Sequence, residues 1–117
     1  MLKFYAYKGC DGCRKARKWL VEREMDFEEL PIRETPPSVA ELKQVLASYD
    51  GKLNRLFSTA GGDYRAMGMK DKLPGMSDKE ALELLSKHGN LVKRPILVGD
   101  EVALAGFKVG EWEEMVG

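Results

Sequence analysis

The stretch YAYKGCDGCRKARKWL, residues Tyr5–Leu20, contains both cysteines of the chain. An apolar, aromatic run at 2–7 precedes them and ends at Gly9, which is typical of a buried strand. From Asp11 onward, apolar residues recur at spacings of three and four with basic residues between them, which predicts an amphipathic helix over 11–24. The two cysteines therefore lie at a turn from a strand to a helix.

The start of this helix favours a negatively charged sulfur. The first backbone N–H groups have no acceptor within the helix, and the helix dipole adds about half a positive charge there. Arg14, Lys15 and Arg17 add further positive charge. Asp11 opposes this, because its carboxylate disfavours a second negative charge, although it could instead cap the helix by accepting a backbone N–H. The net effect on the Cys10 thiol stays open.

The Cys-x-x-Cys spacing suits disulfide chemistry. Cys10, the outer thiol, would attack a disulfide, and Cys13 would resolve the mixed disulfide that results. Two alternatives remain. A structural zinc ion needs four nitrogen or sulfur ligands, but the chain offers only two cysteines and His88, so a carboxylate would have to complete the site. The pair could also be two inert buried thiols.

Composition narrows the class of protein. The chain has 117 residues, with 19 basic and 19 acidic side chains and a formal net charge of zero. This balance gives no overall attraction to nucleic acid or to an anionic membrane, so we expect direct binding to neither. We expect a monomer without a tightly bound cofactor.

The N-terminal apolar run is too short for a secretory signal, and no stretch approaches the ~20 apolar residues of a membrane helix. We therefore expect a cytoplasmic protein. Structural disulfides are rare in that compartment, which favours a reactive or metal-binding role for the cysteine pair.

The middle of the chain is mainly helical. A second strand is predicted at 26–32, where Pro31 is unfavourable for a central position. Ser38 and Ser77 are each followed three residues later by glutamate, the signature of a capping box, and each precedes a helical apolar pattern. In the second of these helices the expected inner face is Ala81, Leu84 and Leu85.

Shorter features complete the pattern. Residues 53–57 predict a helical turn, and the glycine-rich segment 59–64 predicts a loop. Two strands that turn at Gly99–Asp100 predict an antiparallel hairpin, and a short helix is expected over 108–117. With no repeat or linker, the sequence predicts one domain over 1–117.

Two segments, CDGCRKARKWL at 10–20 and the long run from GGDYR to LVKRPILVGDEVALAGF at 61–107, are similar to the ArsC and Spx family of thioredoxin-like proteins. The resemblance implies an α/β, thioredoxin-like fold, with a mixed four-stranded sheet and a helical insertion at about 35–90. It also implies a cis peptide bond between Arg94 and Pro95 that faces the cysteine loop.

The same resemblance implies roles for individual residues. Cys10 corresponds to the redox nucleophile. Arg94 corresponds to an arginine that binds an oxyanion or tunes the thiol, for which the forked guanidinium is suited. Pro95, Asp11 and Gly12 would shape the site. The substrate would be a small thiol or an oxyanion, and the electron donor would be glutathione, a glutaredoxin or a thioredoxin.

The sequence departs from arsenate reductases of this family in two ways. Those enzymes use two further arginines, where this chain has Ser58 and Gly106, and they usually have one loop cysteine. These differences favour a reductase-like or Spx-like member. In Spx-type regulators the cysteine pair is a disulfide switch, and a glycine contacts the RNA polymerase α subunit. Gly51 has a similar place, although a glycine there could simply end a helix.

The sequence thus predicts a thiol-disulfide oxidoreductase of this family, arsenate reductase-like in type. The alternative is a redox-sensing regulator that binds the RNA polymerase α subunit through a Cys10–Cys13 disulfide switch. A third reading, an inactive structural member, predicts that Cys10 reacts no faster than a free peptide thiol.

Overall fold

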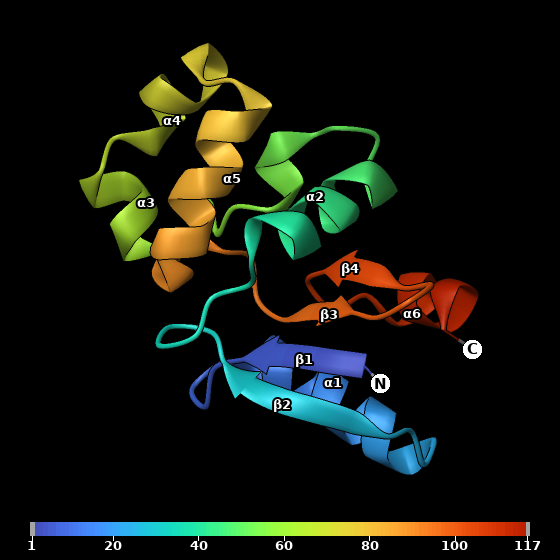
Figure 1. Ribbon diagram of the computed structural model, residues 1–117. Coiled ribbons are helices and arrows are strands. Elements are labelled where there is room, and N and C mark those ends of the chain that lie inside the picture. Colours follow the sequence, from blue (N-terminus) through green and yellow to red (C-terminus); the bar gives the residue numbers. More distant parts are fainter. Residues whose placement is uncertain (1, 117) are drawn as a thin grey trace.

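A mixed four-stranded sheet forms the centre of the computed structural model, which describes residues 2–116. The strand order is β2-β1-β3-β4 (Figure 1). Strand β1 (Leu2–Ala6) pairs in parallel with β2 (Phe27–Pro31) and antiparallel with β3 (Ile96–Val98), and β3 pairs antiparallel with β4 (Ala103–Ala105). The predicted mixed sheet is confirmed, and Pro31 is tolerated because β2 lies at the edge of the sheet.

One face of the sheet is covered by α1 (Asp11–Glu22), which follows β1 and leads into β2 (Figure 1). The apolar spacing seen in the sequence buries one stripe of this helix against the sheet and against α6 (Val109–Met115). Residues of this core include Phe4, Cys13, Ala16, Trp19, Leu20, Leu97, Leu104 and Trp112.

The other face is covered by the helical insertion between β2 and β3 (Figure 1). Its α-helices are α2 (Val39–Ser48), α3 (Gly62–Ala66), α4 (Met69–Lys72) and α5 (Asp78–Lys87), and short 3-10 turns lie at Leu53–Arg55, Leu73–Gly75 and Gly89–Leu91. A second hydrophobic core joins this insertion to the sheet, in which Tyr5, Leu42, Leu85 and Ile96 are buried together. The sheet therefore separates two cores.

Both predicted capping boxes are confirmed. The Ser38 hydroxyl accepts a hydrogen bond from the Glu41 backbone N–H at the start of α2, and the Ser38 backbone N–H donates to the Glu41 side chain. Ser77 and Glu80 form the same reciprocal pair at the start of α5. The predicted hairpin is also confirmed, since the Gly99 backbone N–H donates to the Val102 carbonyl at 2.8 Å.

Other predictions differ in detail. The segment predicted as a loop at 59–64 contains the start of α3 at Gly62, because a short helix can begin at glycine when Tyr64 buries its ring. On α5 the buried face is Ala81, Leu82 and Leu85, while Leu84 is only partly buried. The predicted final helix ends at Met115, and Gly117 lies outside the described residues.

No helix within residues 2–116 is long and apolar enough to cross a lipid bilayer.

Candidate functional site

The cysteine loop and the segment before β3 meet at the edge of the sheet that is formed by the C-terminal ends of β1 and β2 and the N-terminal end of β3. Because β3 runs antiparallel to β1, its first residue Ile96 lies beside Tyr5, and the preceding Pro95 therefore reaches the loop that follows β1. A Cβ atom added to Gly12 would lie 4.0 Å from Pro95 Cδ and 3.8 Å from Cys10 Sγ. The Arg94–Pro95 peptide bond is cis, so both parts of that prediction are confirmed.

Cys10 is half-buried and caps α1. Its sulfur accepts a hydrogen bond from the Cys13 backbone N–H at 3.3 Å, and its own backbone N–H donates to the Tyr7 carbonyl at 3.2 Å. The Cys10 sulfur therefore lies at the N-terminal end of α1, where the free backbone N–H groups and the positive end of the helix dipole are located.

The prediction that Asp11 could cap the helix is wrong. Asp11 is already the first helical residue, and its exposed carboxylate pairs with Arg14 on the outside of α1. The hydrogen bond and the positive charge from Arg14 hold the pKa of Asp11 below its ordinary value. The carboxylate is therefore partly neutralised by a neighbour, and the cap position belongs to Cys10.

Cys13 is fully buried, with an exposed fraction of 0%. Burial, followed by the hydrogen bond with Cys10, raises the pKa of the Cys13 thiol to about 12. Two smaller effects lower this pKa. They are the hydrogen bond that the Tyr7 backbone N–H donates to Cys13 Sγ at 3.4 Å and the positive charge of Arg94. At neutral pH Cys13 is a neutral thiol beneath the more accessible sulfur of Cys10.

Arg94 lies half-buried against Tyr7, with its Cζ atom 5.5 Å from the centre of the ring. A second guanidinium, from Arg33, lies over the same ring with its Cζ atom at 3.7 Å. Sequence reasoning missed Arg33 and Tyr7. The available signal was their position, because each follows a strand that ends at the edge of the sheet beside the cysteines.

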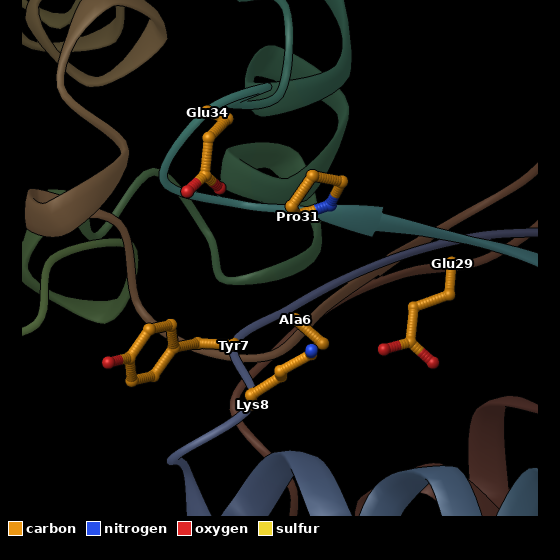
Figure 2. Close-up of a pocket in the computed structure, with 6 residues that line it drawn as sticks. All are labelled: Ala6, Tyr7, Lys8, Glu29, Pro31 and Glu34. Carbon is orange, nitrogen blue, oxygen red and sulfur yellow. The ribbon is translucent and has the colours of Figure 1, made fainter.

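An open pocket of about 610 Å³ lies beside this edge, between the end of β1 and the edge strand β2 (Figure 2). Its lining includes Tyr7, Lys8 and Glu34, and the Glu29 carboxylate also faces it. Arg17 holds Glu29 through hydrogen bonds of 2.7 Å and 2.6 Å, which raise the pKa of Arg17. Cys10 and Cys13 do not line this pocket, so the two thiols lie outside it.

Other residues named from the sequence lie elsewhere. Gly51 follows α2 on the far side of the sheet from α1, and its backbone N–H donates to the Leu46 carbonyl at 3.0 Å. Its φ of 76° is a left-handed conformation that suits glycine at the end of a helix. At Gly106, where an arginine was expected in reductases, a Cβ atom would lie 3.1 Å from Lys93 Cε, so the Lys93 side chain covers this position.

Within residues 2–116, no three His, Cys, Asp or Glu side chains gather closely enough to hold a metal ion. His88 follows α5 as its C-terminal cap, and its backbone N–H donates to the Leu85 carbonyl at 3.2 Å.

Comparison with known proteins gives a consistent result. The chain is 43% identical over 113 residues to the uncharacterised protein YusI of Bacillus subtilis, covering 97% of this chain and 96% of YusI. It is 33% identical to the global transcriptional regulator Spx of Enterococcus faecalis, covering 95% of this chain and 83% of Spx.

Among solved structures, the fold matches that of "a possible arsenate reductase" from Streptococcus mutans UA159 with a TM-score of 0.87 and 34% identity, covering 97% of this chain and 98% of that one. The model of the ArsC family matches residues 5–115. With its cysteine loop, cis-proline and mixed sheet in the expected places, the chain belongs to the ArsC family.

Proposed function

We propose that this protein is a thiol-disulfide oxidoreductase in which Cys10 is the nucleophile and Cys13 is the resolving thiol. The observation that carries the proposal is the hydrogen bond of 3.3 Å from the Cys13 backbone N–H to the half-buried Cys10 sulfur, with the Cys13 sulfur fully buried one helical turn away. In this arrangement a partner can reach the Cys10 sulfur, while the Cys13 sulfur stays buried until it resolves the mixed disulfide.

The reaction proceeds in two exchanges. The Cys10 thiolate attacks one sulfur of an oxidised partner, the S–S bond of the partner breaks, and half of the partner leaves as a thiolate. The Cys13 thiol then gives up its proton to solvent and attacks Cys10 Sγ. This step releases the second half of the partner as a thiolate and leaves a Cys10–Cys13 disulfide, so the partner gains two electrons from the protein.

The high pKa of Cys13 fits the second step. A neutral, buried Cys13 does not compete with Cys10 for the partner in the first exchange. The positive charge of Arg94, which lies close enough to lower the pKa of Cys13, helps the resolving thiol to ionise once Cys10 is in the mixed disulfide. Glutathione, a glutaredoxin or a thioredoxin would return the protein to the dithiol form.

The same nucleophile could act on an oxyanion, as the reductase-like relatives imply. The structure gives less support to arsenate itself. Lys93 covers Gly106, one of the two positions where family reductases have a further arginine, and Ser58 at the other carries no charge.

Two cysteine variants test the mechanism. With hydroxyethyl disulfide as the substrate and glutathione as the donor, Cys10→Ser should abolish turnover, because the attacking sulfur is lost. With hydroxyethyl disulfide alone, and no glutathione to reduce the product, Cys13→Ser should accumulate a mixed disulfide on Cys10, visible by mass spectrometry of the intact protein. Turnover retained in Cys10→Ser would overturn the mechanism.

A redox-sensing regulator is the second candidate. It is supported by the similarity to Spx and by the exposed Gly51, which lines an open groove of about 400 Å³ together with Leu53 and Tyr64. We expect a regulator to bind the RNA polymerase α subunit in only one redox state. A pull-down with reduced and with oxidised protein measures this, and binding in neither state would remove the candidate.

A further inference from the structure

Three strand ends meet at the edge of the sheet that carries the cysteine loop. Tyr7 follows β1, Arg33 follows the parallel neighbour β2, and Arg94 precedes the antiparallel neighbour β3. The two arginines therefore approach the Tyr7 ring from the two strands that flank β1. Their Cζ atoms lie 3.7 Å and 5.5 Å from the centre of that ring.

Neither guanidinium is paired with a carboxylate of the residues that the structure describes. Of the ion pairs formed among residues 2–116, none includes Arg33 or Arg94, whereas four other arginines each pair with a carboxylate. These paired residues are Arg14, Arg17, Arg23 and Arg55. Stacking on an aromatic ring uses the flat face of a guanidinium and leaves its N–H groups at the rim able to donate to an anion.

The backbone holds Arg33 in place. The Ile32 backbone N–H donates to the Ala6 carbonyl at 3.0 Å, and the Thr35 backbone N–H donates to the Pro31 carbonyl at 2.8 Å. On the other side, Gly89 packs so closely that an added Cβ atom would lie 2.8 Å from the Arg33 Cα atom. The position of Arg33 is therefore set by the fold, although its side chain is exposed.

We propose that Arg33 and Arg94 together form a site for the anionic oxygens of the molecule that reacts with Cys10. Arg33 supplies the second guanidinium that Ser58 and Gly106 do not. The reacting molecule is then an anion, either a disulfide that carries carboxylates or a tetrahedral oxyanion. Arg33 is a residue for substrate selection, and the inference rests on the proposed role of Cys10.

The test compares three aliphatic disulfides of similar size that differ in charge. These are dithiodipropionate, which is anionic, hydroxyethyl disulfide, which is neutral, and cystamine, which is cationic. The rate at which each forms a mixed disulfide with Cys10 is measured in the Cys13→Ser background. Arg33→Ala should lower the ratio of the anionic to the neutral rate by about fivefold, the effect of losing one exposed ion pair.

Two further variants serve as controls. Lys18→Ala removes the same charge from an exposed position of α1 away from Tyr7, and screening by salt should leave the ratio unchanged. Arg33→Lys should restore part of the ratio, because it keeps the charge and loses the fork. An oxyanion is tested separately, since inorganic phosphate should slow the anionic probe more than chloride at the same ionic strength if the site accepts a tetrahedral anion.

The outcomes separate the two proposals. If Cys10 reacts with none of the three disulfides, the proposed function fails. If Cys10 reacts with all three and Arg33→Ala slows them equally or not at all, the function stands and the anion site is overturned. If Arg33→Ala slows only the reaction with the anionic disulfide, the anion site is supported. Inhibition by phosphate then shows whether the site accepts carboxylates alone or tetrahedral anions as well.

Discussion

Cys10 and Cys13 have the same chemistry but different surroundings. The Cys10 sulfur is half-buried at the start of α1, whereas the Cys13 sulfur is enclosed by the core between α1 and the sheet. Burial raises the pKa of Cys13 to about 12 because it disfavours the charged thiolate. The roles proposed for the two cysteines, Cys10 as nucleophile and Cys13 as resolving thiol, rest on this difference in position.

This difference predicts the pH dependence of alkylation. A raised pKa means that the fraction of Cys13 present as thiolate stays small until the pH approaches about 12. In Cys10→Ser protein, iodoacetamide should therefore modify Cys13 slowly at pH values where a peptide thiol is already ionised. Mass spectrometry of digested protein, sampled between neutral and alkaline pH, measures the rate. Labelling of Cys13 as fast as that of a free peptide thiol near neutral pH would contradict the description of a buried, neutral sulfur.

Predictions from sequence at the residue scale succeeded where the signal was local. The strand-to-helix turn that carries the cysteines and the two capping serines are readable within a few residues. The role of Asp11 was misassigned because a shift of one residue in the start of α1 decides which side chain is the cap. Arg33 was not found, because its place beside Tyr7 depends on two strands that pair across the fold.

The element scale shows how the helical insertion is joined to the sheet. The turn at Gly89–Leu91 packs against the backbone that follows β2, and Gly89 leaves no room for a side chain between them. The same backbone carries Arg33. The insertion is therefore fastened directly to the edge of the sheet that holds the candidate site.

Gly89→Ala should destabilise the fold, because the new Cβ atom would clash with the Ile32 carbonyl and the Arg33 Cα atom. We expect a loss of about 1–3 kcal/mol in the free energy of unfolding, the usual range for overpacking. Urea unfolding followed by circular dichroism measures it. Gly75→Ala is the matched control, since nothing lies near an added Cβ atom there and its stability should change little. Equal stabilities for the two variants would count against this packing.

A buried phenol joins three elements. The Tyr49 hydroxyl, just after α2, accepts a hydrogen bond from the Ala105 backbone N–H in β4 at 2.9 Å and donates to Glu111 in α6 at 2.6 Å. Burial, followed by the Glu111 hydrogen bond, raises the pKa of Tyr49 to about 12. The hydroxyl therefore stays protonated over the physiological range and can make both bonds.

Removing this hydroxyl should leave the buried Ala105 N–H without its partner. Tyr49→Phe is expected to cost about 1–3 kcal/mol, the penalty for an unsatisfied buried polar group. Tyr64→Phe is a suitable control, because Tyr64 is also buried but packs edge-on against Phe57 through its ring. Thermal unfolding of both variants gives the comparison, and a Tyr49→Phe protein as stable as the control would refute the role of the hydroxyl.

At the scale of the whole molecule, the sheet separates two hydrophobic cores and brings the residues of the candidate site to one edge. The core under α1 places the cysteines, and the core under the insertion places the segments that carry Tyr7 and Arg33. The order of elements and the insertion were predictable because hydrophobic periodicity and capping signals mark each element. The convergence of residues from three strands was not predictable, since it depends on pairing between segments far apart in the sequence.

The central claim is that Cys10 and Cys13 form a reversible redox pair. The most direct test is the reduction potential of the pair, measured by equilibrating the protein in glutathione buffers of known ratio and quantifying the disulfide by mass spectrometry. We predict a Cys10–Cys13 disulfide with a potential of about −180 to −270 mV, the range of thiol-disulfide oxidoreductases. The claim of a reversible redox pair would be contradicted if no such disulfide forms in oxidising buffers, or if its potential lies below about −300 mV, as in structural disulfides.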